Sequence, residues 1–184
     1  MCPRCVSGLS AAPPVTVDGA ASASALLSYT GPTRDLVVAF KYGRNRAVGG
    51  WLGSALVRWL GGVEHTVGAV TWIPTSGIRR RRRGFDQARF LARTVARGTG
   101  LPLITTLARW GSRPQTGLGR SRRLNGPRLS VVLHPSPEPA VGRPVLLVID
   151  DVITTGATAG AACTGLVRAG FPEPHFRALA ATPG

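Results

Sequence analysis

The stretch Val145–Thr158, with the sequence VLLVIDDVITTGAT, decides the fold of this chain. It starts with a short run of valine, leucine and isoleucine after Pro144, and such a run predicts a strand buried on both faces. Strands of this kind are typical of parallel sheets, so we expect an α/β fold with a central, mainly parallel sheet flanked by helices. Asp150 and Asp151 follow the apolar run directly. Because ligands of parallel sheets bind beyond the carboxyl ends of the strands, these two acids are candidate site residues.

The residues after the two acids are suited to hold a phosphate group. They combine one glycine with three hydroxyl side chains, in the order Thr154, Thr155, Gly156 and Thr158. The glycine allows a close approach of the backbone, and the hydroxyls can donate hydrogen bonds to phosphate oxygens. The alanine-rich run 157–169 predicts a helix whose free N–H groups and positive dipole end face this loop. Since the acids can accept hydrogen bonds from sugar hydroxyls, the pattern predicts a site for a phosphorylated sugar.

Three other interpretations of this stretch fit the sequence less well. The magnesium-binding strand of a P-loop nucleotidase requires a GxxxxGK[ST] motif, and the only lysine of the chain, Lys41, precedes Tyr42. A Rossmann dinucleotide site requires GxGxxG after a strand, whereas GLGRSR at Gly117 lacks the third glycine and follows a loop. A purely structural turn does not require two acids and three hydroxyls together.

Three motifs, in the same order along the chain, resemble one protein family. Val145–Thr158 resembles the phosphoribosyl pyrophosphate (PRPP) signature of type I phosphoribosyltransferases, which has a hydrophobic strand, two acids and a Thr-Thr-Gly-x-Thr loop. Within that superfamily, two upstream segments resemble the ComF competence-protein branch: Arg83-Gly84-Phe85-Asp86-Gln87 and the basic stretch 114–123, PQTGLGRSRR. The likeness begins at about residue 30 and implies a type I phosphoribosyltransferase fold with an N-terminal helical hood.

The resemblance implies a role for each motif. The catalytic residues, which would hold the ribose 2′- and 3′-hydroxyls, are Asp150 and Asp151. The 5′-phosphate would be bound by Thr154, Thr155, Gly156, Ala157 and Thr158. Pyrophosphate would be received by a loop and its neighbouring arginines: Pro74, Thr75, Ser76, Gly77, Arg79 and Arg83. A mobile loop, residues 111–125, would close over the reacting centre with Gln115, Arg120, Arg122 and Arg123. Asp86 departs from the family, which often has asparagine there, and places a negative charge near the pyrophosphate.

The chemistry implied by the resemblance needs few conventional catalytic groups. Displacement of pyrophosphate from ribose C1′ passes through an oxocarbenium-like state, which charge placement, a metal on the leaving group and exclusion of water can stabilise. Mg²⁺ would arrive with PRPP, coordinated mainly by its oxygens. Two functions stay open: a transferase that acts on an unidentified nitrogen acceptor, and a non-catalytic PRPP sensor or nucleic-acid-associated factor in competence, DNA uptake or recombination.

The chain is strongly basic. It has 23 lysine and arginine residues against 8 acids, for a net charge of +15, and all of these bases except Lys41 are arginines. This charge, with the run Arg79–Arg83, predicts a polyanionic partner, and any contact with nucleic acid is expected to be independent of sequence. The chain has neither an apolar run of about 18 residues nor a secretory leader pattern, so we expect a cytoplasmic protein without membrane insertion. Its tryptophans offer anchors for a homodimer.

The N-terminal segment carries half of a zinc-binding pattern. Cys2 and Cys5 form a CxxC, and ComF-like proteins often begin with a four-cysteine zinc ribbon. One pair of ligands does not complete a site, and Cys163 is predicted to pack in the core, so no intact zinc centre is expected. We therefore predict a poorly ordered segment 1–24 with a remnant CxxC, followed by a phosphoribosyltransferase-like domain over residues 25–184.

Hydrophobic spacing predicts the remaining elements. Residues 36–59 should form two helices around a basic break at 41–46, and residues 67–73 should form the first strand of the sheet. A helix is expected from Phe85 to the glycines at 98 and 100. Residues 101–107 and 129–133 should be strands on either side of the mobile loop, and residues 175–181 the final strand.

Overall fold

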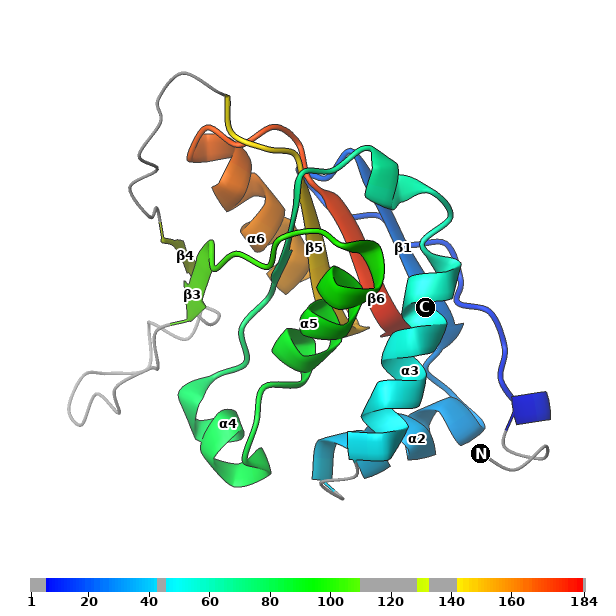
Figure 1. Ribbon diagram of the computed structural model, residues 1–184. Coiled ribbons are helices and arrows are strands. Elements are labelled where there is room, and N and C mark those ends of the chain that lie inside the picture. The colour runs from blue at the N-terminus through cyan, green and yellow to red at the C-terminus, as the bar shows by residue number, and fades with distance from the viewer. Residues whose placement is uncertain (1–5, 43–45, 110–128, 133–141, 184) are drawn as a thin grey trace.

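The computed structural model describes residues 6–42, 46–109, 129–132 and 142–183, and its centre is a parallel sheet (Figure 1). The four strands are β1 (Ser22–Ser28), β2 (Ala69–Trp72), β5 (Leu146–Ile153) and β6 (His175–Ala181), in the order β1-β6-β5-β2. All three neighbouring pairs run parallel. The predicted α/β class with a central parallel sheet is therefore confirmed.

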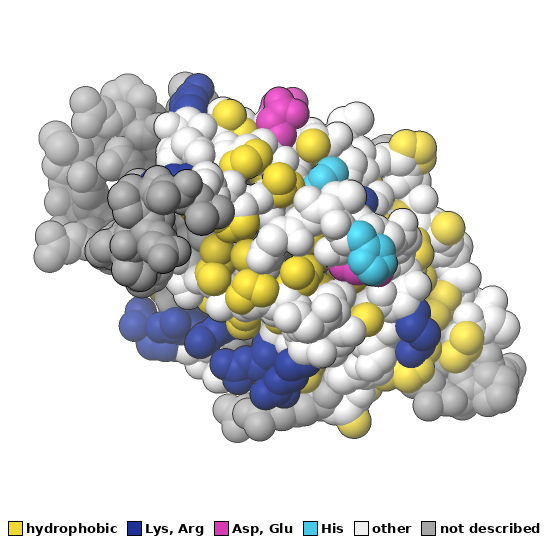
Figure 2. Space-filling model, turned by 45° about the horizontal axis from the view of Figure 1, so that its top comes forward, with side chains coloured by type: hydrophobic (Ala, Val, Ile, Leu, Met, Phe, Trp, Pro, Cys, Tyr) yellow, Lys and Arg dark blue, Asp and Glu magenta, His cyan; other side chains and the backbone are white. Residues whose placement is uncertain are grey.

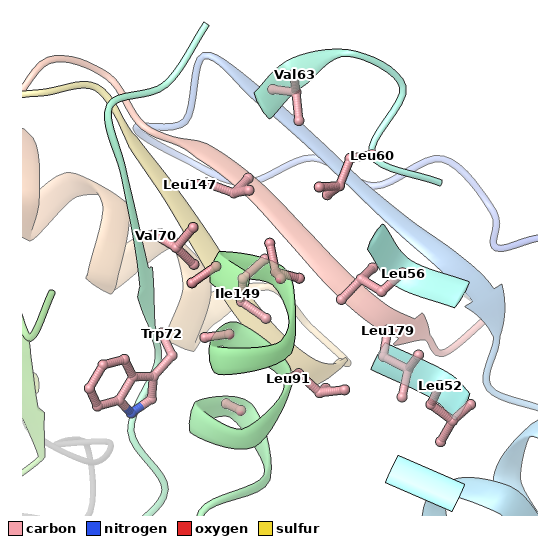
Figure 3. Packing of buried hydrophobic residues seen from close by; sticks show 14 of the residues in the cluster. Leu52, Leu56, Leu60, Val63, Val70, Trp72, Leu91, Leu147, Ile149 and Leu179 are labelled. Atoms are coloured by element: carbon pink, nitrogen blue, oxygen red, sulfur yellow. The ribbon is translucent and has the colours of Figure 1, made fainter. Parts of the chain in front are cut away.

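Helices cover both faces of the sheet, because the side chains of β5 alternate between two apolar clusters. Leu147 and Ile149 pack with α2 (Gly31–Tyr42), α3 (Arg46–Trp59) and α5 (Gln87–Thr99), as Figure 3 shows for the leucines of α3 and α5. Leu146 and Val148 point to the opposite face and pack with α6 (Ala157–Arg168). This two-residue alternation buries β5 on both sides, as the sequence predicts.

Several predicted elements are confirmed. The two helices around the basic break are α2 and α3, and the final strand β6 has the predicted bounds. The helix that follows the threonine loop is α6, and α5 ends at Gly100, whose positive φ of 75° closes the helix as expected for glycine. A short helix that was not predicted, α4 (Gly77–Arg83), contains the arginine run, and a 3-10 turn, η1 (Val63–His65), precedes β2.

Other predictions were wrong in position. The first strand of the sheet is β1, which precedes β2, so residues 67–73 do not hold the first strand. The sequence of β1, SASALLS, lacks the β-branched residues that indicate a strand. Residues 101–106 are not a strand either. Only Leu103 forms an isolated bridge there, with Val70. The strand β3 (Leu107–Arg109) begins after these residues and pairs in antiparallel fashion with β4 (Leu129–Val131).

The N-terminal residues that the structure describes lie against the sheet. β1 begins at Ser22, so the predicted division after residue 24 falls inside a strand. Ahead of it, Ser28 N donates to Ser10 O at 2.9 Å, Ala11 bridges Leu27, and Val17 is buried. Among the described residues, no helix is long and apolar enough to cross a membrane.

Candidate functional site

The two acids lie within β5 and not after it, because the strand continues to Ile153. Each carboxylate accepts a hydrogen bond from the backbone of the next residue: Asp151 N donates to Asp150 Oδ1 at 2.8 Å, and Val152 N donates to Asp151 Oδ1 at 2.7 Å. These bonds fix the orientation of both side chains and leave their other oxygens to face the site.

The threonine loop turns from β5 directly into α6. Gly156 has a φ of +73°, a backbone conformation that residues with a side chain rarely adopt, so the turn favours glycine. α6 starts at Ala157 and spans 12 residues, and its first N–H groups lie at the loop. The loop thus has the backbone donors and hydroxyls predicted for a phosphate site.

The sheet register explains why the two predicted halves of the site meet. Trp72 of β2 is paired with Ile149 of β5 in a parallel ladder, and Ile73 N donates to Ile149 O at 3.0 Å. The chain therefore leaves β2 at Pro74 on the same edge of the sheet at which β5 reaches the acids.

A cavity of about 360 Å³ lies at this edge, and we call it the acid cavity. Its walls bring together the predicted residues Pro74, Thr75, Arg79, Arg83, Asp150, Asp151, Thr154, Thr155, Gly156 and Thr158. Three predicted residues are not in its lining. Ser76 instead caps α4 and accepts a hydrogen bond from Arg79 N at 3.4 Å, Gly77 faces a neighbouring groove, and Ala157 begins α6.

Four polar side chains of the lining were not predicted as site residues from the sequence: Tyr29, Lys41, Gln87 and Arg109. Lys41 is the most informative of them. Its Nζ is 2.9 Å from Asp151 Oδ2, and the two side chains are only 13% and 15% exposed. Being the only lysine in an arginine-rich chain was the one signal in the sequence that could have identified it.

The surroundings of Asp150 raise the pKa of its carboxyl group. The pKa of Asp150 lies well above the usual range for a carboxyl, first because burial withdraws it from water and second because Asp151 repels its negative charge. The Asp151 N–H and the charge of Lys41 act in the opposite direction and favour the ionised form. Asp150 thus holds a proton more tightly than an ordinary aspartate does.

Arg83 is held in place by three groups. It donates to Tyr42 Oη at 3.1 Å and to Gln87 Oε1 at 3.3 Å, and its guanidinium lies 5.1 Å from the centre of the Tyr42 ring. Gln87 is 1% exposed, and its Nε2 has no hydrogen-bond partner in the part of the chain that the structure describes. The cavity wall thus contains a fixed cation beside an unsatisfied buried donor.

Asp86, which the family resemblance predicts to lie near the pyrophosphate, caps α5 and holds the loop that begins at Pro74. Its Oδ2 accepts from Thr75 N at 3.0 Å, and its Oδ1 accepts from Arg89 N at 3.1 Å. Burial raises its pKa, although these two bonds act in the opposite direction. Asp86 therefore supplies two acceptor oxygens that position the predicted pyrophosphate loop.

Some predicted site residues lie outside the described residues: Gln115, Arg120, Arg122, Arg123, Cys2 and Cys5. Cys163 is buried in α6 as predicted, and burial raises the pKa of its thiol to about 12. Over the described ranges, no three histidine, cysteine or acidic side chains gather as a metal site.

No protein-family model matches the chain, and no curated protein matches its sequence. The solved structures that are similar to it include the following two. One is the allosteric regulatory enzyme of purine biosynthesis, with 23% identity over 71% of this chain and a TM-score of 0.48; this chain spans 25% of that protein's length. The other is a purine phosphoribosyltransferase from Pyrococcus horikoshii OT3, with 15% identity over 72% of this chain and 75% of its own, and a TM-score of 0.43.

Proposed function

We propose that the protein binds Mg·PRPP in the acid cavity and transfers its phosphoribosyl group to a nitrogen acceptor. One observation carries this proposal: the continuous stretch of paired acids and threonine loop shares a single cavity with Pro74, Thr75, Arg79 and Arg83, which lie far from it in the sequence. The ComF-like motifs extend the proposal to a cytoplasmic role in competence and DNA uptake, with a homodimer as its predicted form.

Each wall of the cavity suits one part of PRPP. The threonine loop offers hydroxyls and helix N–H groups to the 5′-phosphate, and the two acids accept hydrogen bonds from the ribose hydroxyls. Arg79, Arg83 and Arg109, which also line the cavity, supply positive charge for the pyrophosphate.

This arrangement favours loss of pyrophosphate from C1′. When the C1′–O bond breaks, its electrons leave with the pyrophosphate, whose growing negative charge the arginines stabilise. The ring becomes positively charged, and the carboxylates of Asp150 and Asp151 stabilise this charge. The lone pair of the acceptor nitrogen then forms the bond to C1′, and the proton of that nitrogen passes to water or to the released pyrophosphate.

The donor set of the cavity fits a magnesium ion that arrives with its ligand. Mg²⁺ prefers oxygen ligands and keeps several waters, and it is commonly bound by one or two carboxylates together with substrate phosphates. Asp150 and Asp151 are the carboxylates of this cavity, so they would hold the ion. When bound, it would neutralise charge on the leaving pyrophosphate.

Calorimetric titration with PRPP and its two halves tests the proposal. With Mg²⁺ at moderate salt, PRPP is expected to bind at least about tenfold more tightly than ribose 5-phosphate or pyrophosphate alone, because both walls are engaged at once. Pyrophosphate binding as tight as PRPP binding would contradict it, since the ribose would then contribute nothing. Pyrophosphate release on addition of candidate bases would establish transfer, whereas PRPP binding without release would support the sensor.

Lys41→Met is expected to shift the pH dependence of PRPP binding. The charge of Lys41 lowers the pKa of Asp150, so its removal should raise that pKa further. Affinity, which requires ionised acids, should then fall at a higher pH than in the wild type. Calorimetry across pH 5–8 measures this, with Arg34→Met as a control that removes one positive charge from the exposed side of α2. Superimposable profiles for Lys41→Met and the wild type would show that the ion pair does not influence the acids.

A further inference from the structure

A second and larger hollow lies beside the acid cavity, and five of its lining residues are arginines. Its volume is about 690 Å³, and its walls come from α4, α5 and β3. Five arginines line it, and we call it the arginine groove: Arg80, Arg89, Arg93, Arg97 and Arg109. Neither the sequence motifs nor the proposed transfer reaction assigns it a role.

The groove is basic because of regular spacing on one helix. Arg89, Arg93 and Arg97 are separated by four residues each, so they form one stripe on α5. The stripe covers roughly 12 Å at a rise of about 1.5 Å per residue. A row of guanidinium groups of this length matches a chain of linked phosphates better than a single phosphate.

Three of the five arginines of α4 are divided between the two hollows. Arg79 and Arg83 line the acid cavity, whereas Arg80 lines the arginine groove. A five-residue arginine run that looks like one patch in the sequence therefore serves two different sites. This division makes the two sites separable by mutation.

The arginine groove has an excess of positive charge, because its lining contains five arginines and one acid, Asp86. Within the described parts of the chain, the ion pairs involve Lys41 and His65, and none involves an arginine. The acid in the lining, Asp86, already accepts hydrogen bonds from Thr75 N and Arg89 N. Figure 2 shows basic side chains gathered along one edge of the molecule, with the acids elsewhere on that face.

One of these arginines is already oriented. The guanidinium of Arg89 lies 5.4 Å from the ring centre of Trp72, which is 7% exposed at the base of the groove. Stacking on an aromatic face reduces the freedom of a long side chain without using its hydrogen-bond donors. Those donors are left for a ligand.

We propose that the arginine groove is a second anion-binding site that takes an oligophosphate chain. Guanidinium groups bind phosphate oxygens in pairs, and several in a row favour linked phosphates. A free nucleoside polyphosphate and a phosphodiester backbone both present this chemistry. Because Pro74, Thr75 and Arg109 line both hollows, and Arg109 Nη1 donates to Pro74 O at 3.4 Å, an anion in the groove contacts the back of the acid-cavity loop.

Charge-matched variants test this proposal with inorganic triphosphate as the probe. Arg93→Gln with Arg97→Gln should weaken triphosphate binding about tenfold in calorimetry at moderate salt. The control, Arg34→Gln with Arg168→Gln, removes the same charge from exposed positions on α2 and α6 and should weaken binding less than about twofold. Equal losses in both variants would overturn the proposal, because binding would then follow net charge alone.

A third variant separates this site from the acid cavity. Should Arg79→Gln with Arg83→Gln abolish triphosphate binding while the α5 variant retains it, the probe binds only in the acid cavity and the proposal fails. Unchanged melting temperatures exclude unfolding as the cause. Triphosphate contains no ribose, so these results do not depend on PRPP binding, and failure of one proposal leaves the other standing.

Two further probes identify the source of the phosphates. If a short oligothymidylate loses affinity in the α5 variant and is displaced by triphosphate, the groove takes a phosphodiester backbone. If ATP binding depends on Arg93 and Arg97 while oligothymidylate binding does not, it takes a free polyphosphate.

Discussion

Asp150→Asn is expected to lower the affinity for Mg·PRPP about 100-fold while raising the free energy of unfolding by about 1–2 kcal/mol. Affinity falls because a carboxylate that accepts a hydrogen bond from a ribose hydroxyl is replaced by a neutral amide, which bonds more weakly. Stability rises because a buried negative charge next to Asp151 is removed. Asparagine keeps an oxygen for the Asp151 N–H, and the ion pair of Lys41 with Asp151 stays intact.

Calorimetry and urea unfolding measure these opposite changes. Asp35→Asn is the matched control, because it removes one negative charge from an exposed position on α2 and should alter neither quantity appreciably. If Asp150→Asn destabilised the protein and left affinity unchanged, Asp150 would be a structural residue and the ribose assignment would fail.

The raised pKa of Asp150 also predicts how binding depends on pH. In the proposed complex, ionised Asp150 accepts a hydrogen bond from a ribose hydroxyl. The affinity for PRPP should therefore fall as the pH drops through the pKa of Asp150, which lies above the usual carboxyl range. For stability the sign is reversed: the buried charge is costly above this pKa, and the cost disappears as the pH falls through it. Binding near this pKa should release protons in the wild type but not in Asp150→Asn.

Gln87→Met is expected to lower PRPP affinity about tenfold without loss of stability. The buried Nε2 of Gln87 has no partner among the described residues, and its orientation is fixed because Oε1 accepts from Arg83. A ligand oxygen in the acid cavity would satisfy this donor. Methionine has a similar volume and no such donor, so the folded protein avoids the cost of an unpaired amide while the ligand loses a hydrogen bond.

Thermal unfolding and calorimetry of Gln87→Met distinguish ligand binding from structural support. Gln87→Ala serves as the comparison, since it removes the same amide but leaves a void beside the buried residues Ala88 and Leu91, and should lower the melting temperature. A large loss of stability in Gln87→Met with unchanged affinity would show that the amide serves the fold alone.

The sequence predicted the elements whose signals are local. β5, the threonine loop and α6 form one continuous pattern, and β6 and α5 have clear apolar periodicity. β1 lacks such a signal because its side chains are mostly small, and this segment forms a strand through its pairing with β6. The sequence predicts the end of β5 too early, because acids normally indicate that a buried strand has ended.

The site was predicted only where its residues belong to a motif. Lys41 and Arg109 reach the acid cavity from α2 and β3, and tertiary packing alone brings them there. Two signals were visible in the sequence but were not used: the four-residue spacing of arginines on α5, and Asp86, an N-cap residue placed directly ahead of a helical pattern.

The ion pair of Lys41 also allows ligand binding to be followed by chemical modification of a single side chain. Besides the α-amino group, Lys41 is the only primary amine in the sequence, and it lies in the acid cavity against Asp151. A reagent that acylates primary amines selectively therefore has one internal target, and its rate depends on how often that amine leaves the carboxylate. A ligand that occupies the cavity changes this rate, so mass spectrometry of a single peptide can screen acceptors without a radioactive or fluorescent label.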